Sequence, residues 1–151
     1  MSWVKPVYDR TQADVDFANA NRDSLTPLRG ARNASDLLRI TGNIAEIIQI
    51  LTDLGYVVPT QKSKLAWSIG EVVPESEIDK IRQDIAMLRS IAYILPTTPT
   101  VPNLPYLYYG KINDIEKILY DIYTLEERRV EGFIFSGEMY SGEEFFNGFT
   151  T

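Results

Sequence analysis

The sequence predicts a mainly α-helical protein: a small bundle of three long amphipathic helices, a short N-terminal helix, and a C-terminal β-hairpin or extended arm. Three observations predict this class. Apolar residues recur at steps of three and four in three segments, which is the period of a helix with one buried face. Residues that cap or stop helices stand at the ends of those segments. The chain has 151 residues, 44% of them hydrophobic, which suits a single soluble domain.

The first and shortest helix is expected to start near Thr11. The pattern Thr11-x-x-Asp14 is typical of an N-terminal cap. The segment is polar and should end before Thr26 and Pro27, because a residue that precedes proline avoids helical backbone angles.

The second helix has the strongest pattern. Asn33 is expected to cap it, and Asp36 lies in its first turn, where the helix dipole favours a negative charge. Gly55 should end it, because glycine favours the C-terminal cap conformation. Its apolar stripe comprises Leu37, Ile40, Ile44, Ile47, Ile48, Leu51 and Leu54.

The third helix should begin after Pro74 and stop at Pro96, and the fourth should run from about Pro105 to Arg129. The three apolar stripes have comparable lengths, so the helices can bury one another. The third stripe comprises Ile78, Ile81, Ile85, Leu88, Ile91 and Leu95, and the fourth comprises Ile112, Ile115, Ile118, Leu119, Ile122 and Leu125.

Two connections have a distinctive composition. Proline recurs every third residue at positions 96, 99, 102 and 105, and polyproline II has three residues per turn. This segment is interpreted either as a stiff strap that returns the chain from the third helix to the fourth, or as a ligand for an aromatic groove on a partner. Residues 55–74 are too apolar for a free linker and are expected to pack as extended chain.

A weak internal repeat relates residues 42–54 to residues 110–122, with six of 13 positions identical. One interpretation is a duplication with halves 1–66 and 67–131. The other is the pattern that any two amphipathic, isoleucine-rich helices share.

The C-terminal residues 132–151 differ from the bundle region 1–131. They lack a helical period and repeat an aromatic-Ser-Gly-Glu pattern at 135–138 and 140–143. Aromatic residues favour strands and Ser-Gly favours turns. An isolated hairpin is marginal in water, so this tail is expected to need a partner surface.

Composition excludes several kinds of chemistry. The sequence holds neither cysteine nor histidine, which removes disulfides, thiolate nucleophiles, thiolate zinc sites and Ser-His pairs. Glu138, Glu143 and Glu144 lie near aromatic residues, as the acid and nucleophile of a glycosidase do, but a flexible arm is a poor place for a catalytic pair. We therefore expect no enzyme, no cofactor and no metal site.

The charge is unevenly distributed. The formal net charge is −6, and residues 69–151 hold 14 acidic and 7 basic side chains, which argues against nucleic-acid binding there. One group of basic residues is interpreted as a solvated face, with phosphate binding as the alternative. It comprises Arg22, Arg29, Arg32 and Arg39. No signal-peptide h-region or 20-residue apolar run is present, so a soluble, cytosolically made protein without membrane contact is expected.

Five ordered stretches resemble a family of phage and prophage tail-associated structural proteins of low-GC Gram-positive bacteria. They are Trp3 with Tyr8–Val15, Asn33–Ile44, Trp67–Ile81 with its Pro74-Glu-Ser-Glu, the proline strap with Ile112–Glu116, and Phe135–Glu143. Members of this family often have a longer insert between the first and second helices than residues 20–32 allow.

The resemblance implies a virion structural protein of the phage tail, baseplate or fibre that acts through contacts with other tail proteins or with its own copies, and it carries over no catalytic residue. The alternatives are a non-viral bacterial adaptor and a glycan-binding appendage. The two tryptophans are interpreted as core anchors or as interface residues. The candidate partner-binding residues are Phe133, Phe135, Tyr140, Phe145, Phe146, Phe149, Trp3 and Trp67.

Overall fold

The computed structural model describes residues 3–22, 34–68, 73–103 and 109–141, with side chains as far as Arg129. The described residues form four helices: α1 (Gln12–Ala20), α2 (Ala34–Asp53), α3 (Glu75–Ile91) and α4 (Tyr109–Ser141). The prediction of a mainly helical protein is confirmed, and the described residues contain no strand.

The C-terminal segment differs from its prediction as far as it is described. The backbone of α4 continues to Ser141 instead of ending near Arg129. Residues 132–141 are therefore helical, although we predicted that the tail would begin at residue 132. Residues 142–151 lie outside the described residues, so the hairpin or extended arm stays a prediction there.

Two of the predicted helix ends are formed as expected. Thr11 caps α1 in a capping box with Asp14, although α1 ends at Ala20, earlier than the limit set by Pro27. Gly55 follows α2 with φ +98°. There the Gly55 N–H donates to Thr52 O and the Tyr56 N–H donates to Leu51 O, both at 3.0 Å. This pair of bonds is the Schellman motif. Asn33, the predicted cap of α2, lies outside the described residues.

The end of α3 was predicted four residues too late. The helix stops at Ile91, and Leu95 is 39% exposed instead of belonging to the buried stripe. The turn that follows explains the difference. The Thr98 N–H donates to Leu95 O, and the Leu95 N–H donates to Thr98 Oγ1. Pro96 occupies the second position of this turn, which proline favours.

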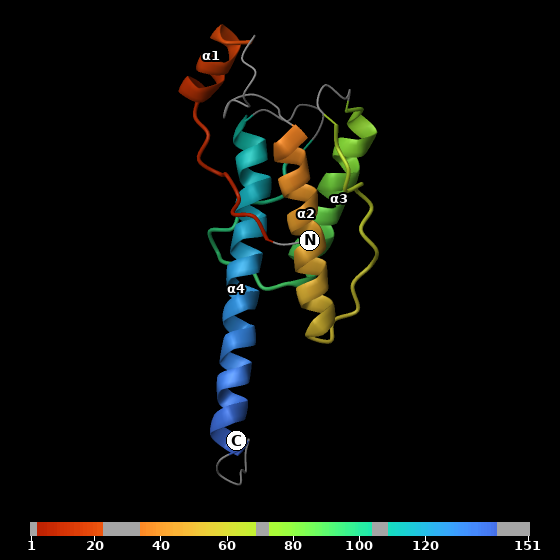
Figure 1. The fold of residues 1–151 in the computed structure, drawn as a ribbon, viewed down its shortest axis with the longest axis vertical. Coiled ribbons are helices and arrows are strands. Elements are labelled where there is room, and N and C mark those ends of the chain that lie inside the picture. The colour runs from red at the N-terminus through yellow and green to blue at the C-terminus, as the bar shows by residue number, and fades with distance from the viewer. Residues whose placement is uncertain (1–2, 23–33, 69–72, 104–108, 142–151) are drawn as a thin grey trace.

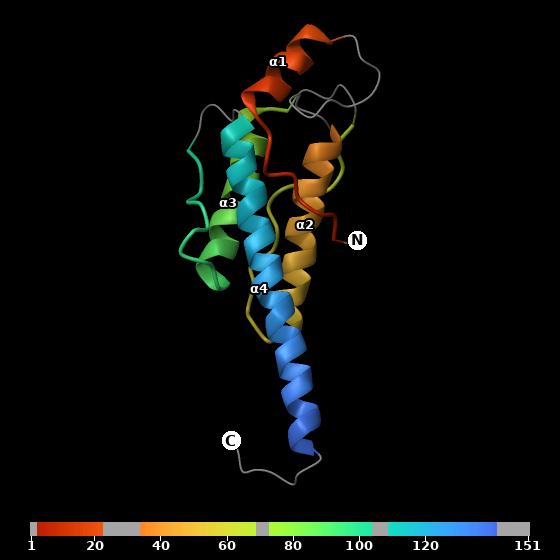
Figure 2. The same cartoon turned by 90° about the vertical axis from the view of Figure 1, so that its left-hand side faces the viewer.

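Helices α2, α3 and α4 pack side by side and run in the same direction (Figures 1 and 2). Their stripes meet in one core, to which Trp67 also contributes. The fully buried side chains at its centre are Ile44, Ile47, Leu51, Ile81, Ile85, Leu88, Ile115, Ile118, Leu119 and Ile122. The helix α1 lies beyond one end of this bundle, and α4 projects from the other end (Figures 1 and 2).

Because the three helices are parallel, the chain must return along the bundle between α2 and α3 and again between α3 and α4, and the N-terminal segment runs in the same direction as these two returns. Three extended segments run opposite to the helices (Figure 1); we name them strap 1 (residues 3–10), strap 2 (residues 56–68) and strap 3 (residues 93–103). Hydrogen bonds place strap 1 against α2 and α4, strap 2 against α2 and α3, and strap 3 against α3 and α4. Each groove between two helices therefore holds one strap.

The proline-rich segment does return the chain from α3 to α4, but its described part is not one regular polyproline helix. Pro96 lies in a turn and is exposed, whereas Pro102 is buried. The prolines therefore do not share one edge. Pro105 lies outside the described residues.

The three bundle helices share a pattern of twelve residues. Its first position is acidic, its second is aliphatic and its fourth is basic. Ile occupies positions 5 and 9, Asn or Asp occupies position 8, and Ile or Leu occupies position 12. It begins at Asp36, Glu77 and Asp114. In each helix the Asn or Asp of the pattern binds the preceding strap. The described bundle is thus built from three strap-and-helix units.

The predicted match of residues 42–54 with 110–122 pairs Asp53, which is exposed, with Asp121, which is buried, so those two aspartates have different roles.

The Gly55→Ala variant is expected to be less stable by about 1 kcal/mol. No atom lies within 4 Å of an added Cβ, so the cost arises only from the left-handed backbone, which disfavours residues with a Cβ atom. Urea denaturation measures this change. The exposed Thr60→Ala change in strap 2 is the control and should shift stability by less than about 0.5 kcal/mol. An unchanged Gly55→Ala midpoint would contradict the role given to the glycine cap.

Candidate functional site

Strap 1 is held by side chains at every third residue. The amide of Asn43 on α2 accepts from Val4 N at 3.0 Å and donates to Val4 O at 2.7 Å. Glu116 Oε1 on α4 accepts from Val7 N at 3.0 Å. An extended segment in a groove between helices has no neighbouring strand, so these side chains supply the partners that its backbone needs.

Asn113 on α4 completes this arrangement at Arg10. Its Oδ1 accepts from Arg10 N at 3.2 Å, and its Nδ2 donates to Arg10 O at 2.9 Å. Asn113 and Asn43 thus bind strap 1 as the edge of a neighbouring strand would. The groove between α2 and α4 is a binding site for extended chain.

A buried ionic cluster fixes the end of strap 1. Glu116 is fully buried, and its Oε2 accepts from Arg10 NH2 at 2.8 Å. Arg39 on α2 binds the same carboxylate with two nitrogens, Nε at 2.7 Å and NH2 at 2.8 Å. Asp36 accepts from both arginines, at 3.3 and 2.7 Å. Among the described residues, two cations and two anions therefore pair with one another in this cluster.

The charge state of this cluster follows from its contacts. Burial alone would lower the pKa of Arg39, but hydrogen bonds to Glu116 and Asp36 and their negative charges raise it above its ordinary value. Arg39 thus stays cationic at every pH at which the protein is handled. The interpretation of the basic group around Arg22 and Arg39 as a solvated face is wrong for Arg39, because Glu116 and Asp36 enclose its guanidinium. Arg29 and Arg32 lie outside the described residues.

Straps 2 and 3 are anchored by the equivalent residues of the next two helices. Asp84 on α3 is buried and accepts from Lys62 N, Ser63 N and Ser63 Oγ at 2.9, 2.9 and 2.6 Å. Asp121 on α4 is buried and accepts from Thr98 Oγ1 at 2.7 Å. Their carboxylates are therefore used in holding the chain.

The two tryptophans have different surroundings. Trp67 is buried in the core, and its indole N–H donates to Lys64 O at 3.1 Å and Thr41 Oγ1 at 3.3 Å. Its interpretation as a core anchor is confirmed, and the part that it was also predicted to play in partner binding stays a prediction for a buried side chain. Trp3 is half-buried in strap 1 and stacks on Tyr123 of α4, with ring centroids 3.7 Å apart.

The side chains of the other six candidate partner-binding residues lie outside the described part of the chain. Phe133, Phe135 and Tyr140 belong to the helical backbone of α4, but their side chains lie outside the described part of the chain. Phe145, Phe146 and Phe149 follow Ser141 and lie outside it as well.

The last described side chains of α4 make an aromatic contact where this helix leaves the bundle. The Arg129 guanidinium lies 5.6 Å from the ring centroid of Tyr56 and 4.8 Å from that of Tyr93. Its NH1 donates to Tyr56 Oη at 2.6 Å and to Glu126 Oε1 at 2.8 Å. Strap 2 and strap 3 thus both contact α4 at this point.

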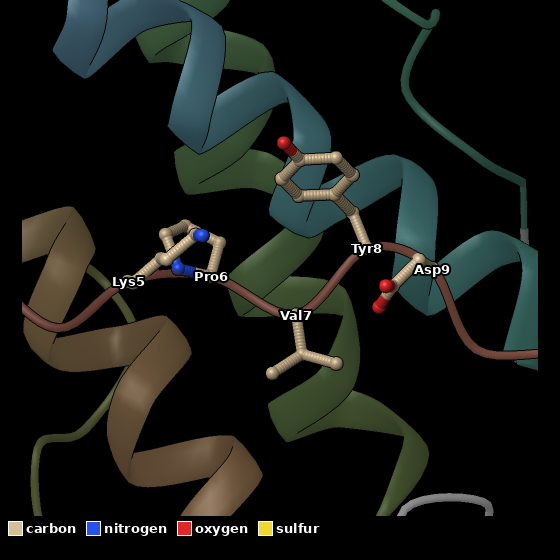
Figure 3. A pocket seen from close by; sticks show the side chains of 5 residues that line it. All are labelled: Lys5, Pro6, Val7, Tyr8 and Asp9. Carbon is tan, nitrogen blue, oxygen red and sulfur yellow. The ribbon is translucent and has the colours of Figure 1, made fainter.

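One shallow pocket of about 290 Å³ is formed on strap 1 itself and is lined by Lys5, Pro6, Val7, Tyr8 and Asp9 (Figure 3). Tyr8 and Val7 point to opposite sides of the strap. Close by, the Tyr8 and Tyr120 rings lie 5.1 Å apart, and Lys117 Nζ is 5.1 and 5.2 Å from their centroids. This is a surface contact that helps to hold the strap.

Within residues 3–22, 34–68, 73–103 and 109–129, no three His, Cys, Asp or Glu side chains are grouped so that they could hold a metal ion. Among the helices of the described chain, none has an apolar stretch long enough to cross a membrane.

Sequence reasoning missed Arg10, Asn43, Asp84 and Glu116 as anchors, although one signal was present. Asn43, Asp84 and Asp121 each stand three residues after one Ile and directly before another. A polar residue at that position of an apolar stripe must face the core or its margin. Its partner has to be buried too, and the sequence alone does not identify that partner.

The Glu116→Gln variant is expected to be less stable by about 3 kcal/mol. The change removes one of two anions that neutralise two buried arginines, and breaking a buried ion pair typically costs 3–5 kcal/mol. The exposed Glu127→Gln on the same helix is the matched control and should cost less than about 0.5 kcal/mol. Urea unfolding compares them; equal midpoints would show that the cluster does not stabilise the fold.

Alkaline pH is expected to weaken the fold partly through Lys117. Its hydrogen bond to Asp121 raises its pKa above 10.5. A raised pKa means that the stabilisation is complete below the ordinary value and is lost as pH rises through the raised value. The free energy of unfolding should fall less between pH 9.5 and about pH 12 in Lys117→Arg, which stays charged there. Identical pH profiles of the variant and the parent protein would refute the contribution of Lys117.

No protein-family model, curated protein or solved structure matches this chain. Its own geometry therefore provides the functional evidence: a parallel bundle with a groove that binds extended chain, and a fourth helix that projects from the opposite end.

Proposed function

We propose that the protein is a structural component of a phage or prophage tail that acts through protein–protein contacts. The ordered resemblance of five stretches to tail-associated proteins supports this proposal. The arrangement of the described residues is compatible with it, because their buried carboxylates bind the chain's own straps and arginines.

The observation that carries the proposal is the projection of α4. The helix continues for twelve residues after Arg129, which is about 18 Å at 1.5 Å per residue. In this stretch it passes the ends of α2 and α3 (Figures 1 and 2). A helix that leaves its own bundle offers a surface to other chains, and this one carries the aromatic-rich sequence predicted to bind a partner.

The bundle would then be a rigid support and the C-terminal segment a docking element. Virion localisation, association with other tail proteins or copies of the chain, and the absence of an enzymatic role all belong to this proposal. A non-viral adaptor would use the same surfaces, so the two functions differ in where the protein is found.

Mass spectrometry and immunogold electron microscopy of particles separate these two functions. The particles should be induced and purified from the bacterium that carries the gene. The proposal expects the protein in tails at a fixed ratio to a tail-tube protein. Its presence in the cell lysate, together with its absence from intact particles and from tail-assembly intermediates, would favour the adaptor.

Deleting residues 132–151 should leave a folded bundle that no longer assembles. The core and all three straps precede residue 132, so circular dichroism and the urea midpoint should change little. Incorporation into particles should fall at least tenfold. Glu138→Gln with Glu143→Gln, which keeps the aromatic residues, is the matched control. If the truncated protein unfolds, the segment belongs to the core and the docking role is wrong.

A further inference from the structure

The Arg129 guanidinium is held in place by side chains from three segments. The rings of Tyr56 on strap 2 and Tyr93 on strap 3 both lie within 6 Å of it. Its NH1 donates to Tyr56 Oη and to Glu126 Oε1. Glu126 is fully buried and also accepts from Tyr93 N at 3.4 Å. The guanidinium is therefore positioned before a ligand arrives, which lowers the entropy cost of binding.

One edge of this guanidinium has no acceptor among the described residues. Both of its hydrogen bonds come from NH1, whereas Nε and NH2 form the opposite edge of the planar group. That edge matches the two oxygens of a carboxylate. Arg39 shows the match in the same molecule, because its Nε and NH2 bind the Glu116 carboxylate at 2.7 and 2.8 Å. The Arg129 side chain is 40% exposed, so a carboxylate from another molecule can approach it.

The surroundings of Arg129 are aromatic and apolar. Tyr93 is 60% exposed, and the neighbouring Val57 and Leu95 of straps 2 and 3 are 94% and 39% exposed. Tyrosine and arginine are enriched among the residues that contribute most to binding between proteins. We name Tyr56, Val57, Tyr93, Leu95 and Arg129 the Arg129 surface. Because its straps begin where α2 and α3 stop, this surface lies at the end of the bundle from which α4 projects (Figures 1 and 2).

The charges near Arg129 favour a ligand with one negative charge. Glu126 already pairs with Arg129 at 2.8 Å, and Glu127 is exposed beside it, so these two carboxylates would repel a doubly charged phosphate. An exposed ion pair contributes little by itself, so apolar contacts must supply much of the affinity. An Asp or Glu with apolar neighbours in a partner protein meets both conditions.

We infer that the Arg129 surface binds a partner protein through an aspartate or glutamate flanked by apolar side chains. The carboxylate binds Nε and NH2 of Arg129, and the apolar side chains pack on Tyr93 and Leu95. The proposed function places docking on the C-terminal segment, whereas this site belongs to the bundle and needs no phage tail. Either proposal can therefore fail while the other stands.

Two synthetic peptides test the inference on the purified full-length chain. Acetyl-Leu-Glu-Leu-amide carries the carboxylate between apolar side chains, and acetyl-Leu-Gln-Leu-amide replaces it with an uncharged amide of similar shape. Titration is followed by NMR through the Arg129 Nε–H and the Tyr93 backbone N–H. The glutamate peptide should shift both resonances in a saturable way and bind about tenfold more tightly than the glutamine peptide, because its hydrogen bonds are charge-assisted.

Three variants show which groups bind the peptide. Arg129→Lys keeps the positive charge but loses the planar edge, so it should remove most of the roughly tenfold preference for glutamate. Arg128→Lys, at the exposed neighbouring arginine, is the matched control and should leave both affinities within about twofold. Tyr93→Ser removes an exposed ring and no core side chain, and it should weaken binding of the glutamate peptide about threefold.

Equal affinity of the parent chain for the two peptides, or unchanged preference in Arg129→Lys, would overturn the inference. Without peptide, an Arg129 Nε–H resonance that moves as the protein is concentrated would also overturn it, because a second copy would then occupy the surface.

Discussion

The parallel direction of three helices is the constraint on which the rest of this structure depends. Antiparallel helices can be joined by short loops, but each parallel helix here starts at the end of the bundle opposite to the point where its predecessor stops (Figure 1). The chain must therefore cross the whole bundle between helices. It does so in extended form along the grooves, where side chains of the helices bind the straps and Trp67 of strap 2 adds to the core that the helices form.

An extended strap in an apolar groove brings backbone N–H and C=O groups out of water without a neighbouring strand to pair them. In straps 1 and 2 the helices meet this need with buried side chains at equivalent positions, Asn43 and Asp84. In strap 3 the equivalent Asp121 binds the Thr98 hydroxyl, and Arg89 binds the backbone oxygens of Thr98 and Pro99. A carboxylate can only accept hydrogen bonds, and Asp84 accepts three from strap 2. Asn43 both donates and accepts, so it can bind both backbone groups of one residue.

The ionic cluster has a different physical role. A buried ion pair is weak evidence for net stability, because desolvation offsets much of the Coulomb attraction. It does, however, discriminate strongly against mispaired states, since any shift of strap 1 along the groove leaves Glu116 or an arginine without its partner. Arg10 thus determines where strap 1 stops, and Arg39 and Asp36 orient the carboxylate that Arg10 must meet.

Sequence patterns predicted the helices because each helix depends on local information. The period of the apolar stripes, the Thr11 cap and the Gly55 cap were enough to locate α2 and much of the other helices. The end of α3 was missed because Thr98 forms its turn with Leu95 ahead of the proline signal. The direction of the helices and the groove of each strap depend on residues distant in the chain, such as Arg10 and Glu116, which no local pattern connects.

The three straps differ in how they are joined to the helices and in how they are anchored. Straps 2 and 3 are each drawn across the bundle by the helices on both of their sides, so covalent connection alone keeps them near their grooves. Strap 1 is followed by α1, which lies beyond the end of the bundle, and it is bound in its groove by side chains of α2 and α4. Among the described residues it is also the strap whose own side chain, that of Arg10, forms a buried ion pair with a helix. The position of strap 1 is therefore fixed by buried Glu116, which binds both its backbone at Val7 and its side chain at Arg10.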